Sequence, residues 1–199
     1  MGLIQLTNTV SPVTLAEAKV QCKLDPTDTS EDSLLNGYLV AATRFCEQRT
    51  HRAFMQSTWR WTGKNFPTRL DSDLCWRVPV APLVSVTSVQ YWSGTLQTLN
   101  ASNYIVDTTN IPGRIQFNSM PSVDDRPEAV QINFVAGYGA SGADDTAQRA
   151  AVPQEIDNII LMLVGTYYDN RQTMMIDGTV DSRLQDWVNS QLSHYFLPF

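Results

Sequence analysis

The stretch SEDSLLNGYLVAATRFCEQR, residues 30–49, decides how this chain is expected to fold. Its apolar residues recur at spacings of three and four, which places them on one side of a helix: Leu34, Leu35, Tyr38, Leu39, Ala42, Phe45 and Cys46. Ser30 stands before Glu31 and Asp32, a pattern typical of a helix N-cap with carboxylates near the positive end of the helix dipole. The sequence therefore predicts an amphipathic helix that runs to about Arg49.

A shorter helix is expected just upstream. Thr14 and Glu17 have the spacing of a capping box, and Pro12 blocks an earlier helix start. The helix should run from about Leu15 to Lys23, because Asp25-Pro26 then breaks it.

Downstream of Arg52 the pattern changes to β-branched and aromatic residues between Pro and Gly. Ser93-Gly94 and Pro112-Gly113 are typical of turns. Six strands are expected: Met55 to Thr62, Trp76 to Val80, Val84 to Trp92, Tyr104 to Val106, Arg114 to Phe117 and Val130 to Val135. Together they predict an antiparallel β unit, followed by an exposed loop from Gly137 to Ala151.

A third long helix is expected from about Pro153 to Asp169, with proline at its first turn. Ile156, Ile159, Ile160, Leu161, Met162, Leu163 and Val164 cover nearly its whole circumference. Such a helix is either wrapped by the rest of the fold or lies between subunits, and the sequence leaves both open. The second reading predicts a subunit interface at Ile156, Ile160, Leu163 and Tyr167.

The C-terminal part predicts a final helix from Arg183 to about Tyr195, with an apolar stripe and an aromatic tail. A tail this apolar is expected to dock, on the chain's own core or on a partner. The residues expected to bind a partner are Trp187, Tyr195, Phe196, Leu197 and Phe199.

These elements predict an α+β fold in which a small bundle of about four helices carries the β unit between its second and third long helices. The expected parts are an N-terminal helical part at 12–52, the β unit at 53–136 and a C-terminal helical part with the docking tail at 152–199.

Composition limits the possible functions. The formal charge is −6 with a pI near 4.8, and no basic cluster is present, which argues against a protein that grips nucleic acid. No apolar run reaches the roughly 18 residues of a membrane span. Three scattered cysteines without a CxxC pair favour a reduced, cytoplasmic origin.

Residues that could carry catalysis are sparse. His51 and His194 are far apart and have no HExxH context, and Asp124-Asp125 and Asp144-Asp145 are not in a DxDxDG loop. The glycine-rich segment 137–142 lacks the Lys-Ser/Thr ending of a phosphate cradle. We therefore expect no enzyme activity, no metal and no cofactor; a hydrolase using Asp124 and Asp125 is a weaker alternative.

Tryptophans give the main alternative. Trp59, Trp61, Trp76 and Trp92 all fall within the β unit, where aromatic faces could stack on sugars. Without basic residues between them they do not indicate nucleic acid. A glycan- or cell-surface-binding module is thus a second hypothesis.

The order of several short motifs resembles bacteriophage head-to-tail connector proteins. They are residues 12–19 (PVTLAEAK), Glu31-Asp32, Ala41-Ala42 through Glu47 to Thr50-His51-Arg52, 56–59 (QSTW), Phe66-Pro67, Pro79-Val80, 84–91 (VSVTSVQY), Tyr104 to Asp107, 135–139 (VAGYG), Val152-Pro153 with Ile156, and 168–171 (YDNR). The resemblance covers residues 12 to 171. One departure is His51, where the family commonly has Gly in a Thr-Gly-Arg turn, so His51 is expected in a left-handed or strained turn.

The resemblance implies a structural virion protein, assembled in the host cytoplasm. Twelve copies would form a ring beneath the portal protein and bind the next neck or tail-completion protein. The ring would join head to tail and line the DNA exit channel, with DNA as a non-specific passenger and no membrane contact.

Overall fold

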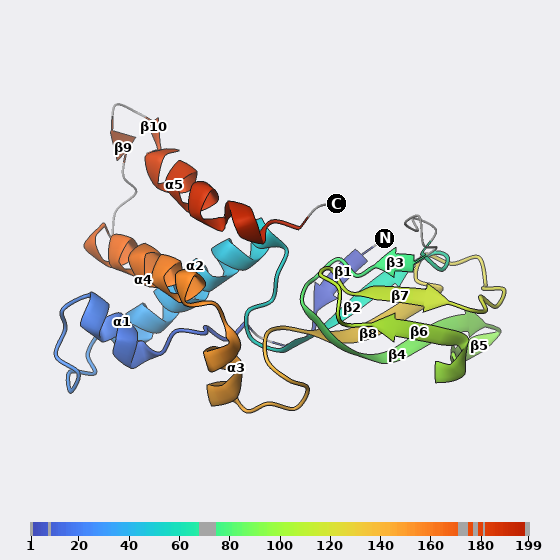
Figure 1. Cartoon of the computed structure of the whole chain (residues 1–199). Coiled ribbons are helices and arrows are strands. Elements are labelled where there is room, and N and C mark those ends of the chain that lie inside the picture. The colour runs from blue at the N-terminus through green and yellow to red at the C-terminus, as the bar shows by residue number, and fades with distance from the viewer. Residues whose placement is uncertain are drawn as a thin grey trace. The chain divides into compact units, whose positions relative to one another are not determined.

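The computed structural model describes residues 2–7, 9–67, 75–170, 175–176, 179–180 and 182–197. The chain divides into two compact units, both discontinuous in sequence (Figure 1). One unit, here the β unit, comprises residues 1–8 and 56–143, and the other, the helical unit, comprises residues 9–55 and 144–199.

The helices of residues 32–50 and 154–169 form the centre of the helical unit, because they contact each other and both contact the first and last helices. The elements of this unit are α1 (Leu15–Gln21), α2 (Asp32–Thr50), α3 (Asp145–Ala151), α4 (Gln154–Asp169), the two-residue strands β9 (Met175–Ile176) and β10 (Thr179–Val180), α5 (Ser182–Leu192) and η2 (Ser193–Tyr195). The core residues of α2 that are fully enclosed include Leu35, Ala42 and Cys46. The amphipathic stripe predicted for residues 30–49 is thus confirmed at Leu35, Leu39, Ala42 and Cys46, which face the other helices, whereas Leu34, also expected in the stripe, is 36% exposed.

Helix starts follow local hydrogen bonding. At α1 the predicted capping box is present: the Glu17 N–H donates to Thr14 Oγ1 at 3.3 Å, and the Thr14 N–H donates to Glu17 Oε2 at 2.7 Å. The prediction of Ser30 as N-cap of α2 is wrong, because that helix begins after Glu31. The Ser30 N–H instead donates to the Asp28 carboxylate at 2.9 Å, which forms a turn in the preceding loop.

Within the loop predicted at 137–151 the structure has a helix, α3. Asp144 caps it, accepting the Ala147 N–H at 2.8 Å. Val152 then ends α3, and Pro153 precedes α4, where the missing N–H of proline leaves no donor unpaired.

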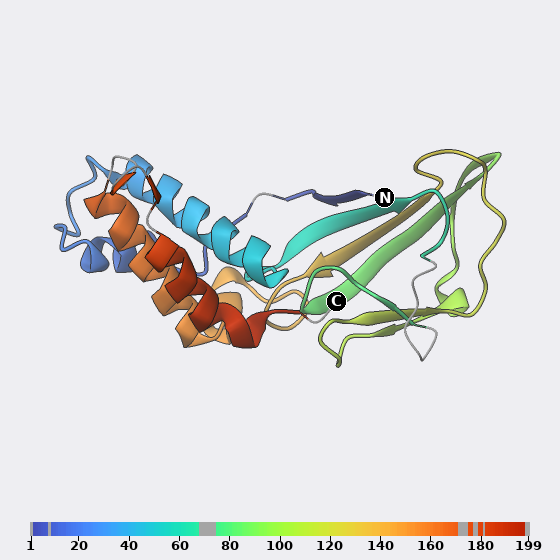
Figure 2. The same ribbon diagram turned by 90° about the horizontal axis from the view of Figure 1, so that it is seen from above.

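The β unit contains two antiparallel sheets (Figure 2). The five-stranded sheet has the order β1-β2-β8-β4-β5, and the three-stranded sheet the order β3-β7-β6. Their bounds are β1 (Gly2–Gln5), β2 (Ser57–Gly63), β3 (Cys75–Arg77), β4 (Leu83–Ser93), β5 (Thr95–Thr98), β6 (Tyr104–Asp107), β7 (Arg114–Phe117) and β8 (Val130–Ala136), with the short helix η1 (Ala101–Asn103) before β6. All six predicted strands are present, whereas β1 and β5 were not predicted.

Two glycines fix the turns of this unit. Gly94 joins β4 to β5 with φ 71°, a conformation that L side chains rarely adopt. At Gly113, between β6 and β7, a Cβ would lie 2.4 Å from the Leu83 Cβ, so any side chain would collide with β4. Both predicted turns are therefore confirmed.

The β unit has its own core, built from residues of both sheets. Val89, Ile115, Ile132 and Phe134 are fully enclosed there. The rings of Trp61 on β2 and Trp76 on β3 lie 5.1 Å apart, joining the two sheets. The mixed helical and antiparallel fold is thus confirmed as two units with separate cores.

Candidate docking surfaces

The apolar face of α4 is buried against other helices of the same chain. Ile156, Ile160 and Leu163 are at most 1% exposed, and Ile159 and Val164 are also buried. The expectation that Ile156, Ile160 and Leu163 line a subunit interface is therefore wrong, because α1, α2 and α5 of the same chain contact this helix. Of the two readings left open by the sequence, the wrapped helix is the one observed.

Met162 and Tyr167 are the side chains on α4 with apolar surface that bear on the expected interface. Met162 is 48% exposed. Tyr167, the fourth residue expected at an interface, is half-buried, and its ring centroid lies 6.0 Å from that of Tyr38 on α2. The apolar surface that α4 offers to a partner is thus small.

The C-terminal segment folds back on the helical unit. Val188, Leu192 and Leu197 are buried, Trp187 and Tyr195 are half-buried, and Phe196 is 41% exposed. Phe199 lies outside the described residues. Helix α5 is therefore packed on α2 and α4 of its own unit, and within the described tail the aromatic side chain most exposed to solvent is Phe196.

Arg52 holds this segment to the end of α2. Its Nε–H donates to the main-chain oxygen of Tyr195 at 2.8 Å, and its guanidinium carbon lies 5.8 Å from the centroid of the Tyr195 ring. One helical turn earlier, Arg49 Nη1 donates to Asn189 Oδ1 at 3.2 Å. Arg49 in the last turn of α2 and Arg52 just after its C-cap thus position the last helix and the tail.

The turn after α2 has the geometry that the resemblance suggested. His51 has φ 53° and ψ 33°, in the left-handed region, and its N–H donates to the Glu47 main-chain oxygen. The expectation of a left-handed turn at His51 is confirmed. The Phe54 N–H donates to Glu47 Oε1 at 2.9 Å, so Glu47 organises the turn with both its main chain and its side chain. Burial raises the pKa of the Glu47 carboxyl to about 7.

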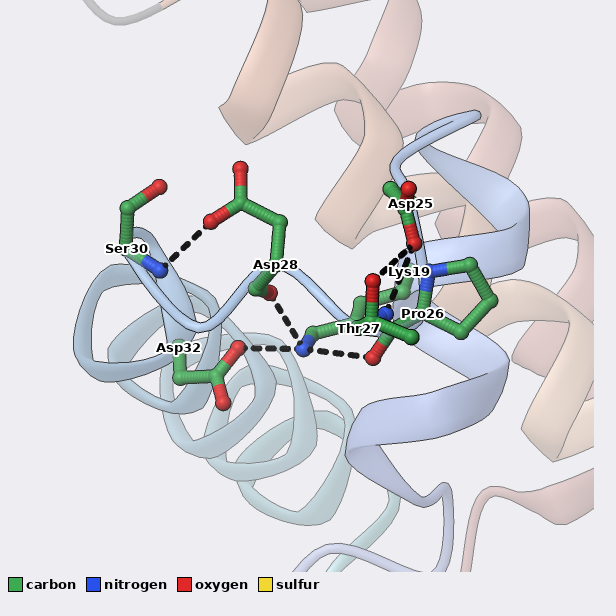
Figure 3. A network of polar contacts seen from close by, with 7 residues as sticks. All are labelled: Lys19, Asp25, Pro26, Thr27, Asp28, Ser30 and Asp32. Carbon is green, nitrogen blue, oxygen red and sulfur yellow. Dashed lines mark hydrogen bonds and ion pairs between the residues drawn. The ribbon is translucent and has the colours of Figure 1, made fainter.

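A buried lysine shapes the loop between α1 and α2 (Figure 3). The side chain of Lys19 is 6% exposed, and its ammonium lies 2.6 Å from Asp32 Oδ1. It also donates to the main-chain oxygens of Pro26 at 3.3 Å and Asp28 at 2.7 Å. Asp25 accepts the N–H and hydroxyl of Thr27 at 2.8 and 2.7 Å, which keeps its pKa below the usual range. Lys19 is therefore a structural cation that closes this acidic loop.

A second buried polar group lies where α1 faces α4. The Asp157 carboxyl is half-buried, and one of its oxygens has no hydrogen-bond partner. Desolvation, and then the nearby Glu17 carboxylate, raise the pKa of Asp157 to about 6. Arg149 partly offsets this, but its own Nη1 donates to the main-chain oxygens of Ser11 and Pro12, both at 2.6 Å.

The two aspartate pairs have structural roles. Asp124 accepts the Gly94 N–H at 2.9 Å, Asp125 pairs with Lys64 at 2.5 Å, and Asp144 caps α3. Among the residues that the structure describes, no three His, Cys, Asp or Glu side chains are placed to hold a metal ion. Over the same residues, no helix is long and apolar enough to cross a bilayer.

Three of the four tryptophans of the β unit, Trp61, Trp76 and Trp92, do not offer an open stacking face. Trp61 and Trp76 are 3% and 4% exposed, so they belong to the core. Trp92 is half-buried and is covered by Arg126, whose guanidinium carbon lies 3.9 Å from the ring centroid. Of the four tryptophans behind the glycan-binding hypothesis, Trp61 and Trp76 are thus inaccessible and Trp92 is stacked on a cation.

Comparison with known proteins agrees with the motif order. Residues 12–75 match the model of a family described as phage gp6-like head-tail connector protein. The resemblance is thereby confirmed for this part of the chain. No curated protein matches the chain in sequence.

Solved structures with the same fold come from gene transfer agent particles. A chain from the neck of an empty particle computed with C6 symmetry has a TM-score of 0.75 and 22% identity. A chain from the virion of a native particle has a TM-score of 0.74 and 21% identity, and one from the neck of a native particle computed with C12 symmetry has 0.68 and 20%. Each comparison covers 100% of this chain and 97% of the other. The shared fold thus includes both units.

Proposed function

We propose that this chain is a non-catalytic structural subunit of the neck of a phage-like particle, where it connects head to tail. The observation that carries the proposal is the connector-family match over residues 12–75, on a chain whose whole length shares the fold of neck proteins. The chemistry agrees with a structural role, because the buried Lys19 closes a loop, Asp124 binds the Gly94 turn and Asp144 caps α3.

The finer form of the proposal is a ring of twelve copies, bound to the portal protein on one side and to the next neck or tail-completion protein on the other. DNA would pass through its centre without specific contacts. The related necks were computed with C6 and C12 symmetry, which is compatible with this copy number. An acidic chain, with a net charge of −6, would not hold the DNA backbone as it passes.

A direct test measures mass and shape. The purified chain, alone and mixed with its portal protein, is examined by native mass spectrometry and by electron microscopy. We expect ring-shaped particles with a central hole, or a defined complex with the portal. A chain that stays monomeric at every concentration and ignores the portal would refute the proposal.

Within this role we propose that Phe196 contacts a partner. Deleting residues 189–199 would be a poor test, because the deletion also removes the buried Leu192 and Leu197. Phe196→Ser changes a side chain that is 41% exposed and leaves those two in place. We expect weaker binding to the portal or the next neck protein with unchanged melting temperature, and Met120→Ser, which alters a residue 44% exposed in the β unit, as the matched control without effect.

A further inference from the structure

The five-stranded sheet ends in two edges of similar character. Strand β1 lies at one end of the order β1-β2-β8-β4-β5 and β5 at the other. Each is four residues long, and every neighbouring pair in this sheet is antiparallel. After four such steps β1 and β5 run in the same direction.

Strand β1 exposes apolar side chains and carries no charge. Leu3 is 40% exposed and Ile4 52% exposed, and Leu6 directly after the strand is 46% exposed. Soluble proteins usually protect an edge strand with Lys, Pro or a bulge. Residues 2–6 contain none of these, and their pairing with β2 continues without a register shift.

Strand β5 has the same chemistry. Residues 95–98 read Thr-Leu-Gln-Thr, all four are exposed, and Leu96 is 42% exposed. No charged side chain and no proline protects this edge either. Such an edge is a template for pairing with another strand.

The register shows which backbone groups face outward. The Leu6 N–H donates to the Thr58 oxygen at 2.8 Å, and antiparallel pairs alternate between bonded and non-bonded positions. The amide and carbonyl of Leu3 therefore point away from β2. Likewise, the Leu99 N–H donates to the Val89 oxygen at 2.8 Å. The amides and carbonyls of Leu96 and Thr98 therefore point away from β4.

We infer that β1 of one copy pairs in parallel with β5 of the next copy, so that the sheets of neighbouring subunits join into one. We infer a second copy as the partner because one chain supplies both strands of the contact. Strands β1 and β5 are different edges of one sheet, have equal length, run in the same direction and are both uncharged. A contact between two different patches is head-to-tail, and it closes into a ring when the rotation between copies allows. The inference rests on the proposed ring and names a surface that holds its copies together.

Cysteine cross-linking tests this pairing. In a parallel pair the outward-facing Leu3 lies opposite a β5 residue that stands between two outward-facing ones and shares its sheet face, which is Gln97 or, two residues along, Thr95. In a background with Cys22→Ser and Cys75→Ser, where Cys46 stays buried, Leu3→Cys is therefore combined with Gln97→Cys or with Thr95→Cys to allow for either register. Paired strands place Cα atoms within the roughly 4.4–6.8 Å that a disulfide spans. We expect oxidation to produce a ladder of covalent multimers with at least one double variant. Each single variant should stay monomeric on a denaturing gel; covalent dimers of Leu3→Cys alone would mean that β1 pairs with β1, which overturns the inference.

Charge insertion provides an independent readout. Ile4→Lys and Leu96→Lys should each reduce the ring fraction at least tenfold, whereas Ile105→Lys should not; Ile105 is 55% exposed on β6 of the other sheet. If electron microscopy shows rings but neither double variant cross-links, edge pairing is refuted and the proposed function stands. If no rings form, alone or with portal, the proposed function fails and this inference with it.

Discussion

Arg52 and Tyr195 join the end of α2 to the short helix η2, across 143 positions of sequence. The guanidinium both donates to the Tyr195 oxygen and lies over its ring. A charged group that makes two contacts of different kinds fixes the main chain just before Phe196.

Arg52→Ala should loosen the tail without unfolding the protein. The hydrogen bond and the cation–π contact are partly exposed, so we expect a loss of about 1–2 kcal/mol in the free energy of unfolding. Amide exchange at residues 195–197 should become faster while exchange in the core of α2 stays slow. Arg44→Ala is the matched control, since Arg44 lies within α2, which ends just before Arg52, and its Nε donates to Thr9 Oγ1 at 3.4 Å, away from the tail.

Lys19→Met should be among the most costly single changes in the helical unit. It leaves the Asp32 carboxylate, with a side chain 27% exposed, beside two main-chain oxygens that have lost their donor. We expect a loss of about 2–4 kcal/mol by chemical denaturation. Lys23→Met, which removes an exposed ammonium nearby, should cost little. An equal effect of the two variants would contradict the structural role of Lys19.

Glu47→Gln should change how stability depends on pH. The folded pKa is raised to about 7 from 4.5, so the folded state binds the proton more tightly than the unfolded state does. The stability contributed by this group is present below about pH 4.5 and is lost as pH rises through about 7. The amide oxygen of Gln can still accept the Phe54 N–H and has no charge to bury. The variant should therefore match the parent near pH 4.5 and exceed it at pH 8 by roughly 1–3 kcal/mol, and a constant difference across this range would contradict the assignment.

His51→Gly should stabilise the protein. A side chain in the left-handed region is strained relative to glycine, and His51 is exposed, so little packing is lost. We expect a gain of about 0.5–1 kcal/mol in the free energy of unfolding. His51→Ala should not give this gain, because alanine has the same Cβ. Equal stability of the two variants would show that the gain does not come from the backbone.

Local signals in the sequence predicted most of this fold. The spacing in residues 30–49 predicted α2, and the Thr14 and Glu17 pair predicted the start of α1. Strand β1 was not predicted from the sequence, because its four uncharged residues carry no turn signal. Their partner β2 lies more than fifty positions away, at Trp59 to Thr62. Helix α3 did have a readable signal, Asp144 at the N-cap position, but its glycine- and aspartate-rich surroundings favoured a loop.

The burial partner of α4 could not be predicted from the sequence, because periodicity shows which residues are buried and does not show which element covers them. Ile156, Ile160 and Leu163 have the pattern of a helix between subunits, and the same pattern serves when the chain's own helices enclose it. The residues now proposed for contact with a second copy, Leu3 and Leu96, lie on short strands whose place at a sheet edge depends on pairing over long distances.

The discontinuity of the two units sets an order for folding during synthesis. Helix α2 leaves the ribosome long before α4, which encloses its apolar side, whereas the β unit is complete once residue 143 has been made. In the nascent chain, Leu35 and Leu39 therefore stay exposed to other apolar surfaces while the inserted sheets form. Slow translation between residues 50 and 154 should favour capture by chaperones, and a chain released at 143 should aggregate through its first two helices although its sheets are finished.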